Sequence, residues 1–325
     1  MKKVIRKALQ IFSIFCEALQ YKRRLMKHKR ILDYNVIRDI DNKSIFKPKI
    51  FVSFTTTSSR INYLKKVINS LLDQSLKPDE IFLFLSDGPY LKDKGVPSRH
   101  IPTSLRRREK KGEICIAYTK NIGPYRKLIP ILKEQYKNKC VIITADDDTI
   151  YPYDWVETLY RSYLNYPQKV AAHRCKLMWF RDKKLALYED WPVIMRNQEM
   201  QRDVQGEIRD KYKDLYLFPT GNSGVLYSPA LVSDLIFDEI FLELAPTNDD
   251  IWFKFMTLIN NIEVSCVKSR LVMNPDFRFA AGYKRNALTD INWSPIGRNN
   301  NRAIMNVINF LEHKKVLNIQ QHLKN

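Results

Sequence analysis

The sequence predicts an α/β fold: an open mixed sheet of Rossmann-like type, flanked by helices and preceded by a basic amphipathic helix. Of the 325 residues, 45% are hydrophobic and 12% aromatic, which is enough for a sizeable core. After Lys49, short runs rich in β-branched and aromatic residues alternate with longer amphipathic runs. This alternation is typical of strands covered by helices, and it excludes a disordered or collagen-like chain.

Four apolar runs are the expected strands, at residues 50–54, 81–85, 114–118 and 141–145. The hydroxyl residues 55–59 follow the first run, and apolar residues at helical spacing then predict a helix over residues 61–72. Ser58 or Ser59 is a suitable N-cap for that helix. A second helix is expected over residues 125–136, before the fourth strand.

Polar residues follow each expected strand. They are Thr55-Thr56-Thr57, Ser86-Asp87-Gly88, Lys120-Asn121 and Asp146-Asp147-Asp148. Because open α/β sheets bind ligands beyond the carboxyl ends of their strands, we expect these residues to line one crevice. The chain has nine glycines and neither GxGxxG nor GxxxxGKS, so the sequence supports neither a dinucleotide fingerprint nor a P-loop ATPase.

The net charge of +20 favours a polyanionic partner, and nearly half of it lies in the first 30 residues. There, ten basic residues face one acidic residue, Glu17, which leaves +9, and apolar residues recur at helical spacing. No apolar run is long enough to span a membrane, and Glu17 interrupts the apolar region that a signal peptide needs. We expect residues 1–45 to bind an anionic membrane surface, with a helix packed on the protein's own core as the alternative. The five cysteines lack paired spacing, which indicates a reducing compartment.

The triplet Asp146-Asp147-Asp148 is a candidate metal site. Three adjacent carboxylates repel one another unless a cation compensates them, and a hard divalent ion such as Mn²⁺ or Mg²⁺ prefers oxygen ligands. The alternative is a solvated acidic turn or a helix N-terminus. The position of the triplet, directly after an apolar strand of a strongly basic chain, favours the metal.

Between about residues 49 and 268, the chain resembles the family 2 glycosyltransferases of the GT-A fold, enzymes of bacterial surface-polysaccharide synthesis. The resemblance rests on the order and spacing of VSFTTTSSR, LSDG, ITADDD, TGNSGVLYSP and TNDDIWF. It implies a catalytic domain over residues 46–275, with a nucleotide-binding part (46–150) and an acceptor-binding part (151–275). A basic loop and helix follow at residues 276–325.

The resemblance also implies an activity. The enzyme would transfer a sugar, with inversion and with a metal ion, from a nucleotide-diphosphate sugar to a hydroxyl of a glycan or lipid-linked glycan acceptor. UDP is the nucleotide expected from the resemblance. Together with the N-terminal helix, this predicts a cytoplasmic protein held peripherally on the inner face of the membrane.

Site residues follow from the same resemblance. Thr55, Thr57 and Arg60 would line the nucleoside pocket, and Asp87 would contact the base. Asp146 would lie near the ribose, beside Asp147, and Asp148 would coordinate the metal with Asp146 as a second ligand. Alternatively, the hydroxyls only cap a helix and Asp87-Gly88-Pro89 is only a turn.

A general base must accept the proton of the attacking acceptor hydroxyl. The pair Asp249-Asp250 resembles the family's acidic motif, whose second acid is the base, and this implies Asp250. Asp stands where Glu is commoner, which leaves Asp249 open as the base. The alternative is a helix start capped by Asn248, whose dipole would lower a carboxylate pKa, whereas burial would raise it.

The remaining candidates lie towards the C-terminus. Gly221, Asn222 and Ser223 would form the acceptor-side floor, where glycine lets the backbone approach a ligand. Lys284, Arg285, Arg298 and Arg302 would close over the donor and neutralise the leaving diphosphate, or would belong to an exposed loop. Aromatic residues between Cys175 and Leu217 would stack on sugars or form ordinary core.

Two other classes of protein stay open. A sugar nucleotidyltransferase would share the fold, but it usually has a glycine-rich loop after the first strand, where this chain has TTTSSR. A nucleic-acid-binding protein would suit the charge and the basic run at residues 106–111. The basic runs have no interleaved aromatic residues for base stacking, so we expect no nucleic-acid partner.

Overall fold

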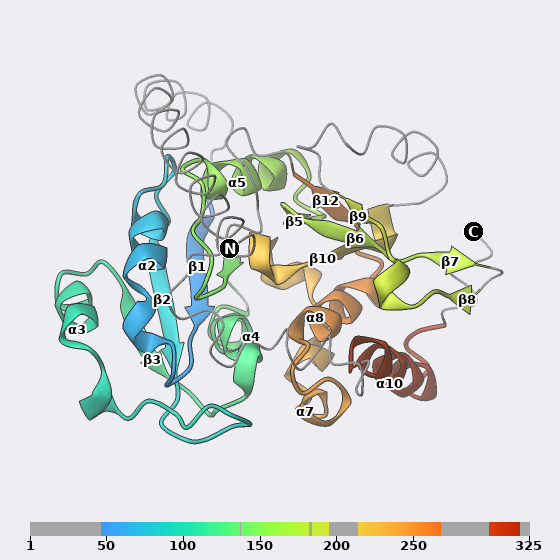
Figure 1. Cartoon of the computed structure of the whole chain (residues 1–325). Coiled ribbons are helices and arrows are strands. Elements are labelled where there is room, and N and C mark those ends of the chain that lie inside the picture. The colour runs from blue at the N-terminus through green and yellow to red at the C-terminus, as the bar shows by residue number, and fades with distance from the viewer. Residues whose placement is uncertain (1–46, 137, 182–183, 195–213, 268–298, 319–325) are drawn as a thin grey trace, which may run out of the picture.

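The computed structural model describes residues 47–136, 138–181, 184–194, 214–267 and 299–318, and it confirms an α/β fold built on a mixed sheet (Figure 1). The seven strands of this sheet have the order β12-β5-β11-β4-β1-β2-β3. β11 runs antiparallel to both of its neighbours, and the other pairings are parallel. The strands are β1 (Lys49–Thr55), β2 (Glu80–Leu85), β3 (Cys115–Tyr118), β4 (Cys140–Ala145), β5 (Val170–Ala172), β11 (Val225–Tyr227) and β12 (Val264–Cys266).

Helices cover the sheet on both faces and at one end. α2 and α3 lie beside β1, β2 and β3, whereas α7, α8 and α10 gather at the other end of the molecule (Figure 1). The helices are α2 (Lys65–Leu72), α3 (Thr103–Lys110), α4 (Ile129–Glu134), α5 (Trp155–Asn165), α7 (Phe241–Leu244), α8 (Asp249–Leu258) and α10 (Asn299–His313). No helix among these described residues is long and apolar enough to cross a membrane, and the expected N-terminal helix lies outside them.

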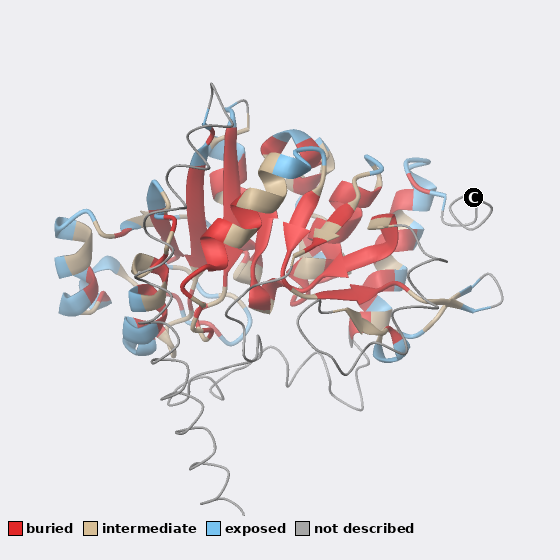
Figure 2. Cartoon of the chain, turned by 90° about the horizontal axis from the view of Figure 1, so that it is seen from above, coloured by how far each residue is buried: buried red, intermediate tan, exposed pale blue. Residues whose placement is uncertain are grey.

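β1, β2 and β4 form as expected because they are buried on both faces, where continuous apolar runs are favoured, whereas the edge strand β3 is only partly buried. Ile50, Val52 and Phe54 of β1 pack into one cluster with α2 and α5. Phe51, on the opposite face, packs into the cluster that holds α4 and α8. Figure 2 shows the central strands as the buried layer of the molecule.

Both expected helices of the first half are shorter than predicted. A 3-10 turn, Ile61–Tyr63, precedes α2, and no side chain caps either element, so the expected cap at Ser58 or Ser59 is wrong. Ser58 instead donates its backbone N–H to Asp93 at 2.9 Å. The second helix divides into a 3-10 turn, Gly123–Lys127, and α4. Pro130 lacks the N–H that would bond to the residue four positions earlier, which explains the break.

A smaller sheet of three strands, β10-β6-β9, lies beside the main one. It consists of β6 (Cys175–Leu177), β9 (Val193–Ile194) and β10 (Leu217–Pro219), and a hairpin of β7 (Phe180–Arg181) and β8 (Lys184–Leu185) follows β6. Trp191 and Tyr216 are buried in the core, with Trp191 packed edge-on against Phe218. These two aromatic residues therefore belong to the core and do not form a surface on which a sugar could stack.

Candidate active site

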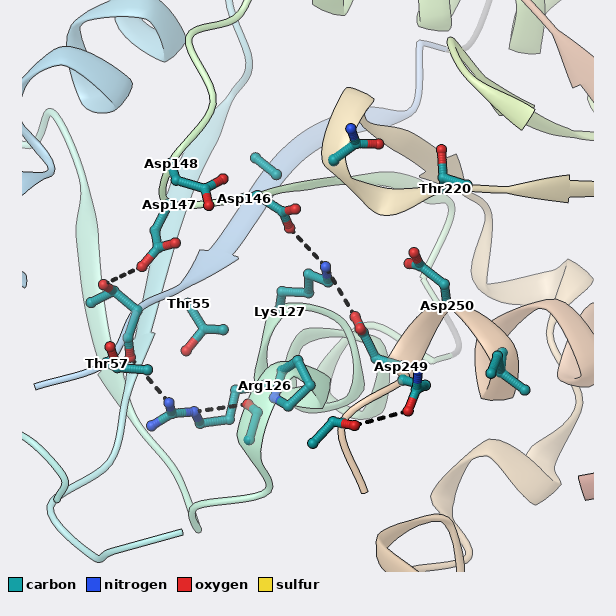
Figure 3. A pocket seen from close by; sticks show the side chains of 18 of the residues that line it. Thr55, Thr57, Arg126, Lys127, Asp146, Asp147, Asp148, Thr220, Asp249 and Asp250 are labelled. Carbon is teal, nitrogen blue, oxygen red and sulfur yellow. Dashed lines mark hydrogen bonds and ion pairs between the residues drawn. The ribbon is translucent and has the colours of Figure 1, made fainter. Parts of the chain in front are cut away.

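A pocket of about 330 Å³ opens at the carboxyl ends of β1 and β4 and at the N-terminus of α8 (Figure 3). It is large enough for part of a small ligand. Nine of the site residues expected from the sequence line it: Thr55, Thr57, Arg60, Asp146, Asp147, Asp148, Asn222, Asp249 and Asp250. The triplet Asp146-Asp147-Asp148 and the pair Asp249-Asp250, the two acidic groups of the site, are far apart in the sequence but line a single pocket.

The polar ends of β2 and β3 do not join this pocket, so the expectation of one crevice is wrong. Asp87 is exposed and lines a separate depression with Ser98, Tyr118, Thr119 and Lys120. After β2 the chain folds back, and residues 90–93 line the main pocket in place of Asp87. Asn121, which follows β3, donates its side-chain amide to Gly88 O at 2.7 Å and helps to hold that turn.

The acidic triplet is compensated by basic side chains. Asp147 is buried, accepts a hydrogen bond from Thr56 Oγ1 at 2.5 Å and pairs with Arg60 Nη1 at 3.0 Å. Burial raises the pKa of Asp147 to about 6, although the positive charge of Arg60 opposes the shift. The same guanidinium donates to Asp148 through Nη2. Arg60 therefore holds two neighbouring carboxylates at the pocket wall.

Lys127 connects the two acidic groups, and the sequence analysis did not single it out. Its Nζ lies 2.8 Å from Asp146 Oδ1 and 3.0 Å from Asp249 Oδ2, so that one buried ammonium bridges both walls (Figure 3). Burial lowers the pKa of Lys127, but the nearby carboxylates outweigh burial and raise it well above its ordinary value. Lys127 is charged at neutral pH, and it fixes the distance between the two acids.

Asp249 and Asp250 begin α8, where they lie among buried residues. The Gly221 N–H donates to Asp250 Oδ2 at 3.0 Å. Burial, reinforced by the charge of Asp249, raises the pKa of Asp250 to about 7, while Lys127 acts in the opposite direction. Burial also raises the pKa of Asp249. The side chain of Asn248 makes no capping hydrogen bond, although it occupies the N-cap position.

The segment expected as the acceptor-side floor meets the pocket only in part. Asn222 lines the pocket, and Gly221 packs so closely that an added Cβ would lie 2.7 Å from Asp250 Oδ1 and 3.0 Å from Lys127 Nζ. Ser223 is buried and does not line the pocket, and its carbonyl accepts from the Trp155 indole at 2.8 Å. Glycine at position 221 is therefore required for the contact between the floor and the acids.

Arg126 and Asp93 form a buried pair at the edge of the pocket, with Nη2 and Oδ2 3.0 Å apart. Arg126 also donates to Thr56 O at 3.0 Å, which ties the turn after β1 to the turn after β2. The sequence signal was available, because Arg126 and Lys127 closely follow the end of β3. Both residues fall within the helix that is expected over residues 125–136. Lys284, Arg285 and Arg298 lie outside the described residues.

The described part of the chain contains no group of three or more His, Cys, Asp or Glu side chains placed to hold a metal ion. Asp146 and Asp148 nevertheless both line the pocket, and their side chains retain 28% and 12% exposure. Mg²⁺ commonly takes one or two carboxylates and completes its shell with substrate phosphate oxygens and water. The pair fits an ion of that kind rather than a site closed by protein ligands.

Comparisons with known proteins give distant likenesses in structure. No protein-family model and no curated protein matches the chain. TarS 1-349 from S. aureus, solved in complex with UDP, is similar over 67% of this chain, with 17% identity and a TM-score of 0.40. TarS 1-349 in a second crystal structure has 18% identity over the same share, with a TM-score of 0.39. The chain spans 58% of the length of each TarS chain. A CMP:2-keto-3-deoxy-manno-octonic acid synthetase complexed with CTP is similar over 68% of this chain and 89% of its own, with 14% identity and a TM-score of 0.35.

Proposed function

We propose that the protein is an inverting, metal-dependent glycosyltransferase of the GT-A type that uses a nucleotide-diphosphate sugar, with UDP as the nucleotide. The observation that supports this most is the meeting of Asp146 to Asp148 and Asp249-Asp250 around one pocket, with a base of pKa about 7 on one wall. A general base works best when its pKa is near the pH at which it operates. Asp250 meets that condition at neutral pH.

In the proposed reaction, the acceptor hydroxyl gives its proton to Asp250 as its oxygen bonds to the anomeric carbon of the donor sugar. The bond from that carbon to the diphosphate breaks, and the nucleoside diphosphate leaves with the electron pair, so that the configuration inverts. Arg60 and Lys127 lie where they can stabilise the charge that develops on the diphosphate. Mn²⁺ or Mg²⁺ held by Asp148 and Asp146 would supply further charge neutralisation.

The remaining parts of the proposal concern partners and location. Thr55 and Thr57 are proposed to contact the nucleoside, and Asn222 the acceptor, a glycan or lipid-linked glycan. Asp87 contacts the base only if the nucleoside extends beyond the pocket, since it lines a different depression. The N-terminal basic segment is proposed to hold the enzyme on the inner face of the membrane.

The test is a panel of nucleotide sugars, with release of the nucleoside diphosphate measured with Mn²⁺ or Mg²⁺ and again after chelation. A UDP-sugar is expected to be hydrolysed only with the metal. Asp148→Ala is expected to abolish turnover without unfolding the protein, because Asp147 still pairs with Arg60. Full activity of this variant would contradict the proposed role. Release of pyrophosphate from CTP or UTP and a free or phosphorylated sugar would instead indicate a nucleotidyltransferase.

A further inference from the structure

Two further basic side chains, Arg174 and Lys176, line the same pocket. Lys176 belongs to β6, and Arg174, two positions earlier, directly precedes the first residue of this strand. Both side chains line the pocket, Lys176 from β6 and Arg174 from the residue that precedes this strand.

Neighbouring groups hold both side chains in place. Arg174 Nη1 donates to Thr220 Oγ1 at 2.9 Å, and Thr220 returns its backbone N–H to Arg174 O at 3.0 Å. Lys176 Nζ donates to Tyr188 O at 2.7 Å and lies 3.9 Å from the centre of the Tyr188 ring. Lys176 is 5% exposed, so the orientation of its side chain is set by the surrounding protein rather than by solvent.

These basic groups lie on the side of the pocket that holds the proposed base. Thr220, the partner of Arg174, precedes Gly221, whose N–H donates to Asp250 at 3.0 Å. Burial, followed by the charge of Asp250, raises the pKa of Tyr188, the partner of Lys176. In Figure 3, Thr220 and Asp250 lie on one side of Lys127, and Asp147 and Asp148 lie on the other.

The two positive charges are held close together at an energetic cost. Burial, and then the charge of Arg174, lowers the pKa of Lys176 to about 8, while the exposed Glu189 and Asp190 oppose this shift. An oxyanion next to both groups would relieve the repulsion between them. Arginine is well suited to such a ligand because its guanidinium can donate two parallel hydrogen bonds to phosphate or carboxylate.

We propose that Arg174 and Lys176 form an anion subsite that binds a phosphate or carboxylate group of the acceptor, next to the hydroxyl that Asp250 deprotonates. The acceptor is then a charged glycan or a phosphorylated one rather than a neutral sugar. This inference rests on the proposed function, because that function makes the Asp250 side of the pocket the acceptor side.

The test uses the full chain and isothermal titration calorimetry. UDP is titrated first, with Mn²⁺ present, and inorganic phosphate and glucuronate are then titrated with UDP held in excess, so that the diphosphate subsite is filled. Arg174→Gln and Lys176→Met keep most of the side-chain volume, and Lys120→Met is the matched control, because Lys120 lines the separate depression. Each pocket variant is expected to weaken binding of the anion about tenfold or more, as loss of a charged hydrogen bond predicts, with UDP affinity unchanged.

The outcomes separate the possible sources of the anion. Stronger binding of phosphate than of glucuronate indicates a phosphorylated acceptor, and stronger binding of glucuronate indicates an acceptor that contains a uronic acid. Either result supports the subsite if Arg174→Gln abolishes the preference. Equal anion affinity in the wild type and both pocket variants would overturn it. An equal loss of UDP affinity would also overturn it, because the basic pair would then serve the donor diphosphate. If no nucleoside diphosphate binds, the proposed function fails, while titration of phosphate alone still reports on the subsite.

Discussion

Replacement of Asp250 by Asn is expected to stabilise the protein at alkaline pH while it lowers the proposed transferase activity. The pKa of Asp250 is about 7 in the folded chain, against an ordinary value of 3.8. Between these two values the unfolded chain releases the proton and the folded chain keeps it, so that rising pH favours the unfolded state. Asparagine does not ionise, and its side-chain oxygen can still accept the Gly221 N–H.

The magnitude follows from the size of the shift. A shift of one pKa unit corresponds to about 1.4 kcal/mol. The ionisable carboxyl of Asp250 therefore lowers the free energy of unfolding by at most about 4 kcal/mol at pH 8, but by only about 2 kcal/mol at pH 5. Asp250→Asn should therefore raise the free energy of unfolding by up to those amounts, with a larger gain at pH 8. Loss of the proposed general base should lower the rate of the proposed transfer by about 10²–10⁴-fold.

Urea denaturation followed by tryptophan fluorescence, at pH 5 and at pH 8, measures the change in stability. Asp234→Asn is the control, because Asp234 is exposed and its replacement should change the free energy of unfolding by less than about 0.5 kcal/mol at either pH. A gain that is the same at both pH values, or a net loss at pH 8, would refute the assignment of a raised pKa to Asp250. Unchanged transfer in the variant would refute its role as the base.

Two further substitutions test how the site is built. Lys127→Met should lower the free energy of unfolding by about 3–5 kcal/mol, because it leaves buried carboxylates without their counter-ion. Lys120→Met, which removes an exposed ion pair, should lower it by less than about 1 kcal/mol. Equal losses of the two variants in urea denaturation would contradict the bridging role of Lys127. Gly224→Ala should lower the free energy of unfolding more than Gly112→Ala does, because the new Cβ at position 224 would lie 2.4 Å from the Trp155 ring. At position 112 the new Cβ meets no neighbour, so the loss there is only the roughly 1 kcal/mol that a positive φ costs. Thermal melting of the two alanine variants measures the difference, and equal melting temperatures would show that Trp155 moves aside.

Much of the sheet could be predicted because its signals are local. Continuous apolar runs mark β1, β2 and β4, which are buried on both faces, and the polar residues that follow β1 and β4 line the pocket. The helix at residues 125–136 was predicted too long, since the apolar spacing continues across Pro130 while the missing N–H interrupts the helix. The spacing of apolar residues carries no information about the missing N–H of Pro130.

The candidate site was only partly predictable, because its contacts join segments that are distant in sequence. The sequence by itself determined the two acidic motifs, the basic charge balance and the absence of glycine-rich phosphate loops. Only the tertiary structure decided that Asp93 rather than Asp87 borders the main pocket, since this depends on how the chain folds back after β2. The same holds for Lys127, whose bridge between Asp146 and Asp249 exists only where the turn after β3 meets the start of α8. Burial at that meeting point turns ordinary surface residue types into a charged network in which the carboxyl of Asp250 has a pKa of about 7.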